Sequence, residues 1–171
     1  MASSPGSVLP PIPSFPFVNI STGLLTPTAV QFLQQLYGAI GGPGAVGTWT
    51  PLLQGSVTTG SPSYNAQTGN WRKVNKMTWF FSQISLSSLG GASGNLSISG
   101  LPYNTSGAAT ILVGYSNVAL STAYTEIVGL LADQSSTLNL MQQGTNQSMT
   151  PLTDQNMSDN SILLISGTYG T

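Results

Sequence analysis

The stretch that decides the fold is residues 67–103, which read QTGNWRKVNKMTWFFSQISLSSLGGASGNLSISGLPY. Ile84 and Leu86 alternate with polar residues, and Leu96 and Ile98 do the same after a glycine-rich turn. Alternation with a period of two is typical of strands that bury one face. Two such runs on either side of a glycine-rich turn predict a β-hairpin.

The first half of the first of these strands has a different pattern. Met77, Trp79 and Phe81 share one face, and Phe80 lies on the other, so both faces are apolar. A strand of this kind is internal to a larger body or covered by another chain. We therefore predict that Met77, Trp79 and Phe81 pack against neighbouring chains.

Short strand patterns separated by turn clusters follow one another from Trp49 to the end of the chain. With no helical pattern between them, they predict an all-β fold, an antiparallel β-sandwich of the jelly-roll type, over residues 46–171. The expected strands are Thr48–Gln54, Gly69–Asn75, Met77–Ser88, Asn95–Gly100, Thr110–Tyr115, Tyr124–Leu131, Thr137–Gln143 and Ser161–Tyr169. The apolar run 162–165 in the last of them predicts a central position in the sheet.

The composition excludes several classes of function. The 171 residues include no Cys and no His, and only 4% are charged. Imidazole and thiolate chemistry are therefore absent, and we expect no enzyme and no cofactor. The net charge of -1 gives no field for nucleic acid, and no apolar run is long enough to insert into a membrane. A neutral surface rich in hydroxyl and amide groups favours a component of an assembly.

Residues 1–45 are expected to form an anchoring arm with one short helix. Five prolines predict an extended arm up to about Phe17, and Thr26 and Pro27 predict the start of a helix that ends near Gly38. The alternatives for the arm are that it packs on its own domain or is a frayed terminus. The alternative for the helix is that it lies on its own sheet instead of in a three-chain bundle or a partner's socket. The candidate anchoring residues are Leu9, Ile12, Phe15, Phe17, Val30, Leu33 and Tyr37.

Three features of the sequence are weak signals of a ligand or catalytic site. Trp71, Arg72, Lys73 and Lys76 are candidates for contact with a surface ligand, although the basic residues can equally pair with acidic side chains. The four acidic residues are scattered and form no recognisable catalytic pair. Residues 154–159 resemble a calcium loop without its central Gly and final Glu, so Asx-type turns are the preferred interpretation.

Several segments together resemble a β-sandwich module found in virion proteins of tailed bacteriophages, such as tail fibres, tailspike ends and head fibres. The residues that carry the resemblance are Trp49-Thr50-Pro51, Tyr64, Gln67-Thr68-Gly69-Asn70-Trp71, Val74-Asn75-Lys76-Met77-Thr78-Trp79-Phe80, Ile84-Ser85-Leu86, Ser99-Gly100-Leu101-Pro102 and Ile165-Ser166-Gly167-Thr168-Tyr169, with Thr22-Gly23-Leu24-Leu25-Thr26 before the helix. The chain differs from such modules in its lower charge and in having no long shaft.

The resemblance implies a short homotrimeric tail fibre or appendage located in the virion and made in the cytoplasm of the bacterial host. Its N-terminal arm would bind other virion proteins (tail adaptor, tail or capsid), and its β-domain would contact the host surface, including a surface glycan. A head decoration (cement) protein is the first alternative, and a lone carbohydrate-binding module is the second.

Overall fold

The structure is a computed structural model that describes residues 16–39 and 44–171. The chain divides into two compact units, an N-terminal unit of residues 1–44 and a β-domain of residues 45–171, each of which is described by itself. The expected arm up to residue 15, with Leu9, Ile12 and Phe15, lies outside the described residues.

The described part of the N-terminal unit is a helix preceded by a small hairpin. The helix α1 spans Pro27–Ala39. It begins as expected, because the Thr26 hydroxyl oxygen accepts a hydrogen bond of 3.2 Å from the Ala29 backbone N–H. The Phe17 and Phe32 rings meet edge to face with their centroids 5.6 Å apart. This contact fastens the hairpin to one side of the helix.

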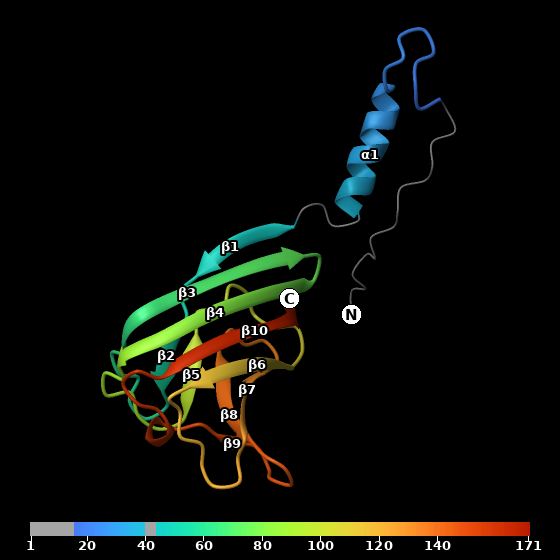
Figure 1. Ribbon diagram of the computed structural model, residues 1–171. Coiled ribbons are helices and arrows are strands. Elements are labelled where there is room, and N and C mark those ends of the chain that lie inside the picture. The colour runs from blue at the N-terminus through green and yellow to red at the C-terminus, as the bar shows by residue number, and fades with distance from the viewer. Residues whose placement is uncertain (1–15, 40–43) are drawn as a thin grey trace. The chain divides into compact units, whose positions relative to one another are not determined.

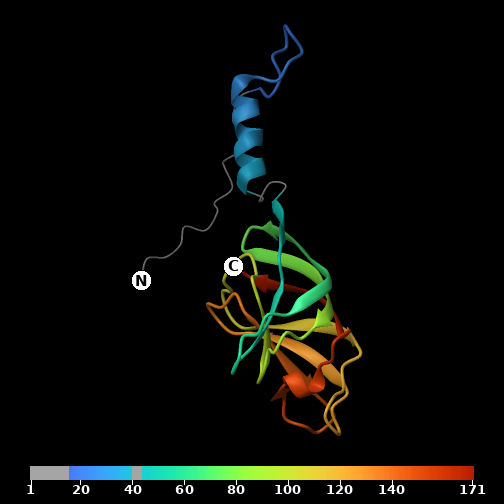
Figure 2. The same cartoon turned by 90° about the vertical axis from the view of Figure 1, so that its left-hand side faces the viewer.

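The β-domain is built from one ten-stranded, antiparallel sheet that curls into two layers (Figures 1 and 2). The all-β class and the single short helix are therefore confirmed. The strands are β1 (Ala45–Trp49), β2 (Leu52–Gly55), β3 (Ser63–Val74), β4 (Met77–Ser88), β5 (Leu96–Ser99), β6 (Ala109–Ser116), β7 (Glu126–Leu131), β8 (Leu138–Gln143), β9 (Thr150–Pro151) and β10 (Ile162–Gly170), and a 3-10 turn, η1 (Asp154–Asn156), precedes the last strand.

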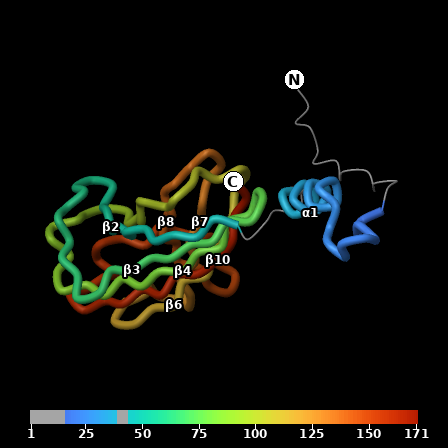
Figure 3. The backbone as a smooth tube through the Cα atoms, turned by 90° about the horizontal axis from the view of Figure 1, so that it is seen from above, coloured from blue at the N-terminus to red at the C-terminus, as the bar shows by residue number. Residues whose placement is uncertain are grey.

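The order of the strands explains the curl. Along the sheet they follow the order β1-β3-β4-β10-β6-β7-β8-β5-β2, and β9 pairs with β8. The first and last strands of this order are consecutive in the chain, and only Thr50 and Pro51 separate them. The two ends of the sheet must therefore come close together at this corner. Figure 3 shows the layer of β3, β4, β10 and β6 beside the layer of β2, β7 and β8.

Two strand predictions are corrected. The expected strand Thr48–Gln54 is two strands, because Pro51 has no N–H to continue a ladder and the chain turns there to the other end of the sheet. The expected hairpin of β4 and β5 does not form. The strand β4 pairs with β3 and β10, whereas β5 pairs with β2 and β8. Gly90 and Gly91 adopt positive φ angles where the chain crosses from one layer to the other.

The core lies between the two layers. Most of its members are inward-pointing residues of the strands, and Leu101, Leu152 and Met157 join them from connecting segments. Phe80 sits between the rings of Trp49 and Tyr169, at centroid distances of 5.9 and 5.6 Å. Ile84 and Leu86 are fully buried, so the predicted alternation of β4 is confirmed. The strand β10 lies between β4 and β6, which confirms its expected central position.

Among the described residues, no helix has the length and apolar content needed to cross a bilayer.

Candidate functional site

The candidate functional site is the outward-facing side of the layer β1-β3-β4-β10-β6. In β4 every second residue points inward, and the first three residues that point outward, Met77, Trp79 and Phe81, have large apolar side chains. Neighbouring β6 and β10 add two exposed leucines to the same side. We call this surface the outer apolar face and define it by Met77, Trp79, Phe81, Leu112 and Leu164.

The register of the strands places these residues side by side. Phe81 is paired with Ser166 of β10, and Ser166 is paired in turn with Leu112 of β6. Leu164 lies two residues before Ser166 on the same strand and is paired with Gly114. Since outward residues two positions apart on a strand share a face, these side chains belong to a single surface.

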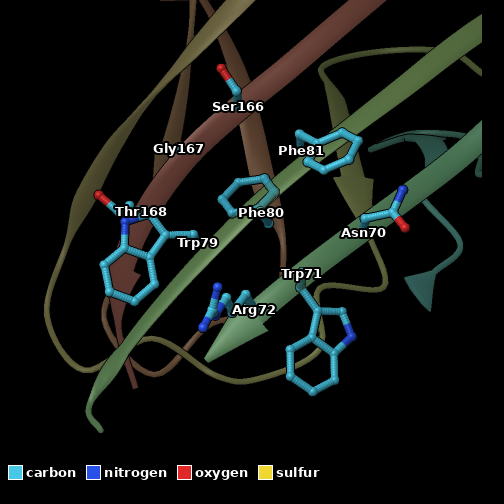
Figure 4. Close-up of a pocket in the computed structure, with 9 residues that line it drawn as sticks. All are labelled: Asn70, Trp71, Arg72, Trp79, Phe80, Phe81, Ser166, Gly167 and Thr168. Carbon is cyan, nitrogen blue, oxygen red and sulfur yellow. The ribbon is translucent and has the colours of Figure 1, made fainter. Parts of the chain in front are cut away.

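Small residues between the large ones leave two hollows on this face. The first has a volume of about 450 Å³ and is lined by Trp79, Phe81, Arg72 and Thr168, among others (Figure 4). The second, of about 340 Å³, lies on the other side of Phe81 and includes Leu112 and Leu164 in its wall. Phe81 and Ser166 line both hollows. The Phe81 ring therefore stands as a projection between two depressions.

Charge is nearly absent from the two hollows. Arg72 is the one charged residue among those lining them, and it is paired with Trp79 across β3 and β4. Three of the four acidic side chains are used elsewhere to brace turns: Asp133, Asp154 and Asp159 accept backbone N–H groups of Gly107, Gly94 and Leu89 at 2.6, 2.9 and 2.8 Å. The described residues contain no group of three or more His, Cys, Asp or Glu placed to hold a metal ion.

The predicted ligand-contact residues do not share one surface. Arg72 is exposed on the outer side of β3, whereas Trp71 and Lys73 are half-buried on its opposite side. Both contact Tyr103: the Trp71 ring lies edge to face at 5.2 Å, and the Lys73 Nζ atom lies 4.2 Å from the ring centroid. The Trp71 indole N–H also donates to the Thr48 carbonyl oxygen at 3.3 Å. The prediction of ligand contact itself is untested.

The expected anchoring residues of the N-terminal unit also separate into two sets. Phe17 packs against Phe32 within the unit. Val30, Leu33 and Tyr37 are exposed along the helix at spacings of three and four residues, which is the spacing of one helix face. They form a second exposed apolar stripe, and their role as anchors is a prediction.

The shifted pKa values lie away from the outer apolar face. Burial raises the pKa of Tyr169 to about 12, although the hydroxyl donates a 3.2 Å hydrogen bond to the Tyr103 carbonyl. Burial also raises the pKa of Tyr64. Backbone N–H donation from Gly94 lowers the pKa of Asp154, so this carboxylate acts as a turn brace in its charged form.

The sequence predictions missed Leu112 and Leu164. Both stand in wholly apolar runs, Ile111-Leu112-Val113 and Ile162-Leu163-Leu164-Ile165, where the apolar residue on the outer face is hidden by its neighbours. The signal that could have found them is an apolar residue between two core residues of the same strand, because alternation turns it to the outer face.

Comparisons with known proteins include a solved structure of similar fold. No protein-family model matches the sequence. No curated protein matches it either. The crystal structure of the Dettilon tailspike protein resembles this chain with a TM-score of 0.60 and 20% sequence identity, over 74% of this chain and 23% of the tailspike chain. The likeness shows a shared fold, and the match spans about a quarter of the tailspike's length.

Proposed function

We propose that this chain is a structural, non-enzymatic component of a tailed-bacteriophage particle. In this proposal it forms a short homotrimeric tail fibre or appendage, with the N-terminal unit bound to other virion proteins and the β-domain directed towards the host surface. The observation that carries the proposal is the likeness of fold to part of a tailspike protein, which agrees with the phage-type residue pattern of the sequence.

The distribution of polar groups supports a structural role. The acidic residues that a hydrolase would need are held in turns by backbone N–H groups, 60 and 70 residues away along the chain in the cases of Asp154 and Asp159. Exposed apolar side chains gather on the outer apolar face and on the helix stripe. Surfaces of this kind are typical of contacts between proteins.

The role of the N-terminal unit can be tested by charge substitution on its exposed stripe. The double variant Leu33→Asp, Tyr37→Asp places two charges on the stripe, and Gln31→Asp, Gln34→Asp places the same two charges on exposed polar positions of the same helix. Each variant would be supplied as the sole source of the chain during particle production. Its abundance in purified particles would then be measured by mass spectrometry.

We expect the stripe variant to be lost from particles and the control to be retained, because a charge buried in an apolar contact has a high desolvation cost. Equal retention of both variants would contradict anchoring through Val30, Leu33 and Tyr37. Copies distributed over the capsid lattice would favour the head decoration protein, and a particle that lacks the chain entirely would contradict the virion role.

A further inference from the structure

We propose that the outer apolar face is the surface through which copies of this chain pack against each other. The inference rests on the proposed function in that it names the contact that holds the appendage together. Each copy would turn the face of β4, β6 and β10 towards a shared symmetry axis. Phe81 would then lie at the centre of the contact, between the two hollows.

The exposed area is the first argument. Large apolar side chains present roughly 150–250 Å² each when fully exposed, so the five exposed fractions together leave on the order of 500 Å² of apolar side chain in water. The largest apolar patch on a typical monomer is about 300–600 Å², and a stable interface buries roughly 800 Å² per partner. The fractions are 41% for Met77, 45% for Trp79, 60% for Phe81, 71% for Leu112 and 53% for Leu164.

The second argument is the shape of the face, on which one side chain projects between two hollows. Sheets that pack face to face do so by interdigitating side chains from the two surfaces. Phe81 projects between hollows of about 450 and 340 Å³. A cavity of about 150 Å³ is enough to bind benzene, so either hollow can take a phenyl ring from a facing copy. One surface therefore carries both the projection and its receptor, as contact between identical copies requires.

The third argument is charge. Copies of one chain bring the same charges to their contact, so a face used for self-association must carry few of them. Arg72 is the single charged residue of the two hollows, and it lies on β3 at the rim, away from Leu112 and Leu164 on β6 and β10. A glycan is a less suitable occupant, because its hydroxyl groups would lose water against a mainly apolar surface.

The test is the mass of the full-length chain in solution, measured by sedimentation over a wide range of concentrations. We expect wild type to form an oligomer of the 17.7 kDa chain. Phe81→Asp should raise the dissociation constant at least tenfold, and the milder Phe81→Ser should act in the same direction. The matched control is Leu52→Asp, which places the same charge on an exposed leucine in β2 of the other layer.

A cross-linking experiment gives an independent readout, because the chain contains no Cys of its own. Ser166→Cys places a thiol between Phe81 and Leu112, and Ser97→Cys places one in β5 of the other layer. A short bis-maleimide should join copies through Cys at position 166 and leave those with Cys at position 97 unjoined. Adding Phe81→Asp should abolish the cross-link.

The outcomes separate this inference from the proposed function. A monomeric wild type, or an oligomer that Phe81→Asp and Leu52→Asp weaken equally, would overturn the assignment of this face. In either case the particle-incorporation experiment would decide the virion role on its own. A monomer whose Trp79→Ala variant loses affinity for a glycan would show that the face binds sugar.

Discussion

Two adjacent leucines of β10 provide a direct test of which face of the sheet belongs to the core. Leu163 is fully buried and is paired with Ile84 of β4, whereas Leu164 has 53% of its surface exposed on the outer apolar face. The paired substitutions are Leu163→Ala and Leu164→Ala. Both remove the same atoms from the same strand, so propensity and backbone effects largely cancel between them.

The structure gives an expected size for each effect. Replacing a buried leucine by alanine costs the transfer free energy of the lost carbons and a cavity term, together about 3 kcal/mol here. At Leu164 roughly half of the transfer term applies and solvent fills the space, which gives less than about 1 kcal/mol. The difference of about 2 kcal/mol or more corresponds to at least a thirtyfold change in the unfolding equilibrium, since a factor of ten is about 1.4 kcal/mol.

The assay is urea unfolding followed by tryptophan fluorescence. It would be run in the Phe81→Asp background, at a concentration below the raised dissociation constant, so that association does not contribute to the measured free energy. With a slope of about 2 kcal/mol per molar urea, the midpoint should fall by about 1.5 M for Leu163→Ala and by less than about 0.5 M for Leu164→Ala. Equal shifts, or a larger shift for Leu164→Ala, would refute the assigned orientation of β10.

Three further predictions concern single residues. The Ser82 hydroxyl is buried without a hydrogen-bond partner among the described residues. Ser82→Ala should therefore leave the free energy of unfolding unchanged or raise it by about 1 kcal/mol. A clear loss of stability in urea would contradict this. Burial raises the pKa of Tyr169 from 10 to about 12, so its contribution to stability is complete below pH 10 and is lost as the pH rises towards 12. Tyr169→Phe should flatten this decline in the free energy of unfolding. An unchanged decline would contradict the raised pKa of Tyr169. Thr26→Ala removes the N-cap of α1 and should cost about 1 kcal/mol of helix stability, seen as reduced helical circular dichroism, whereas the same change at exposed Thr28 should have little effect.

Local pattern was enough to predict the class of fold and the faces of single strands. The strand β4 has the bounds and the alternation that the sequence indicated, because Ile84 and Leu86 leave one arrangement that buries them both. The start of the helix could also be predicted from the sequence, since Thr26 and Pro27 are local signals whose effect does not depend on the rest of the chain. In both cases the interactions that decide the local structure join residues that are close together in the sequence.

Strand pairing was not readable in the same way. The runs at β4 and β5 look like a hairpin, but β5 lies in the other layer, because both strands must point their apolar sides into one core. The strand β10 enters between β4 and β6 from far along the sequence, and the pattern of β4 carries no sign of this. Such pairings are decided by how the whole sheet curls.

The sequence predicts only part of the outer apolar face, because the rest of it depends on how the strands pair. Met77, Trp79 and Phe81 were singled out because one strand cannot bury two apolar faces in its own two-layer domain. Leu112 and Leu164 join them only through the register of β6, β10 and β4. The tryptophan and the basic residues at the end of β3 are close in the sequence but lie on different faces, because alternation sends Trp71 towards Tyr103 and Arg72 to the opposite face.

The most direct test of the proposed virion role and of the proposed contact between copies is a reconstruction of a phage particle produced with this chain. The account predicts copies grouped around a three-fold axis at a tail appendage, with Phe81, Leu112 and Leu164 of each copy buried against neighbouring copies and the N-terminal unit against another virion protein. Copies that stand apart on the particle, with the outer apolar face open to solvent, would contradict it.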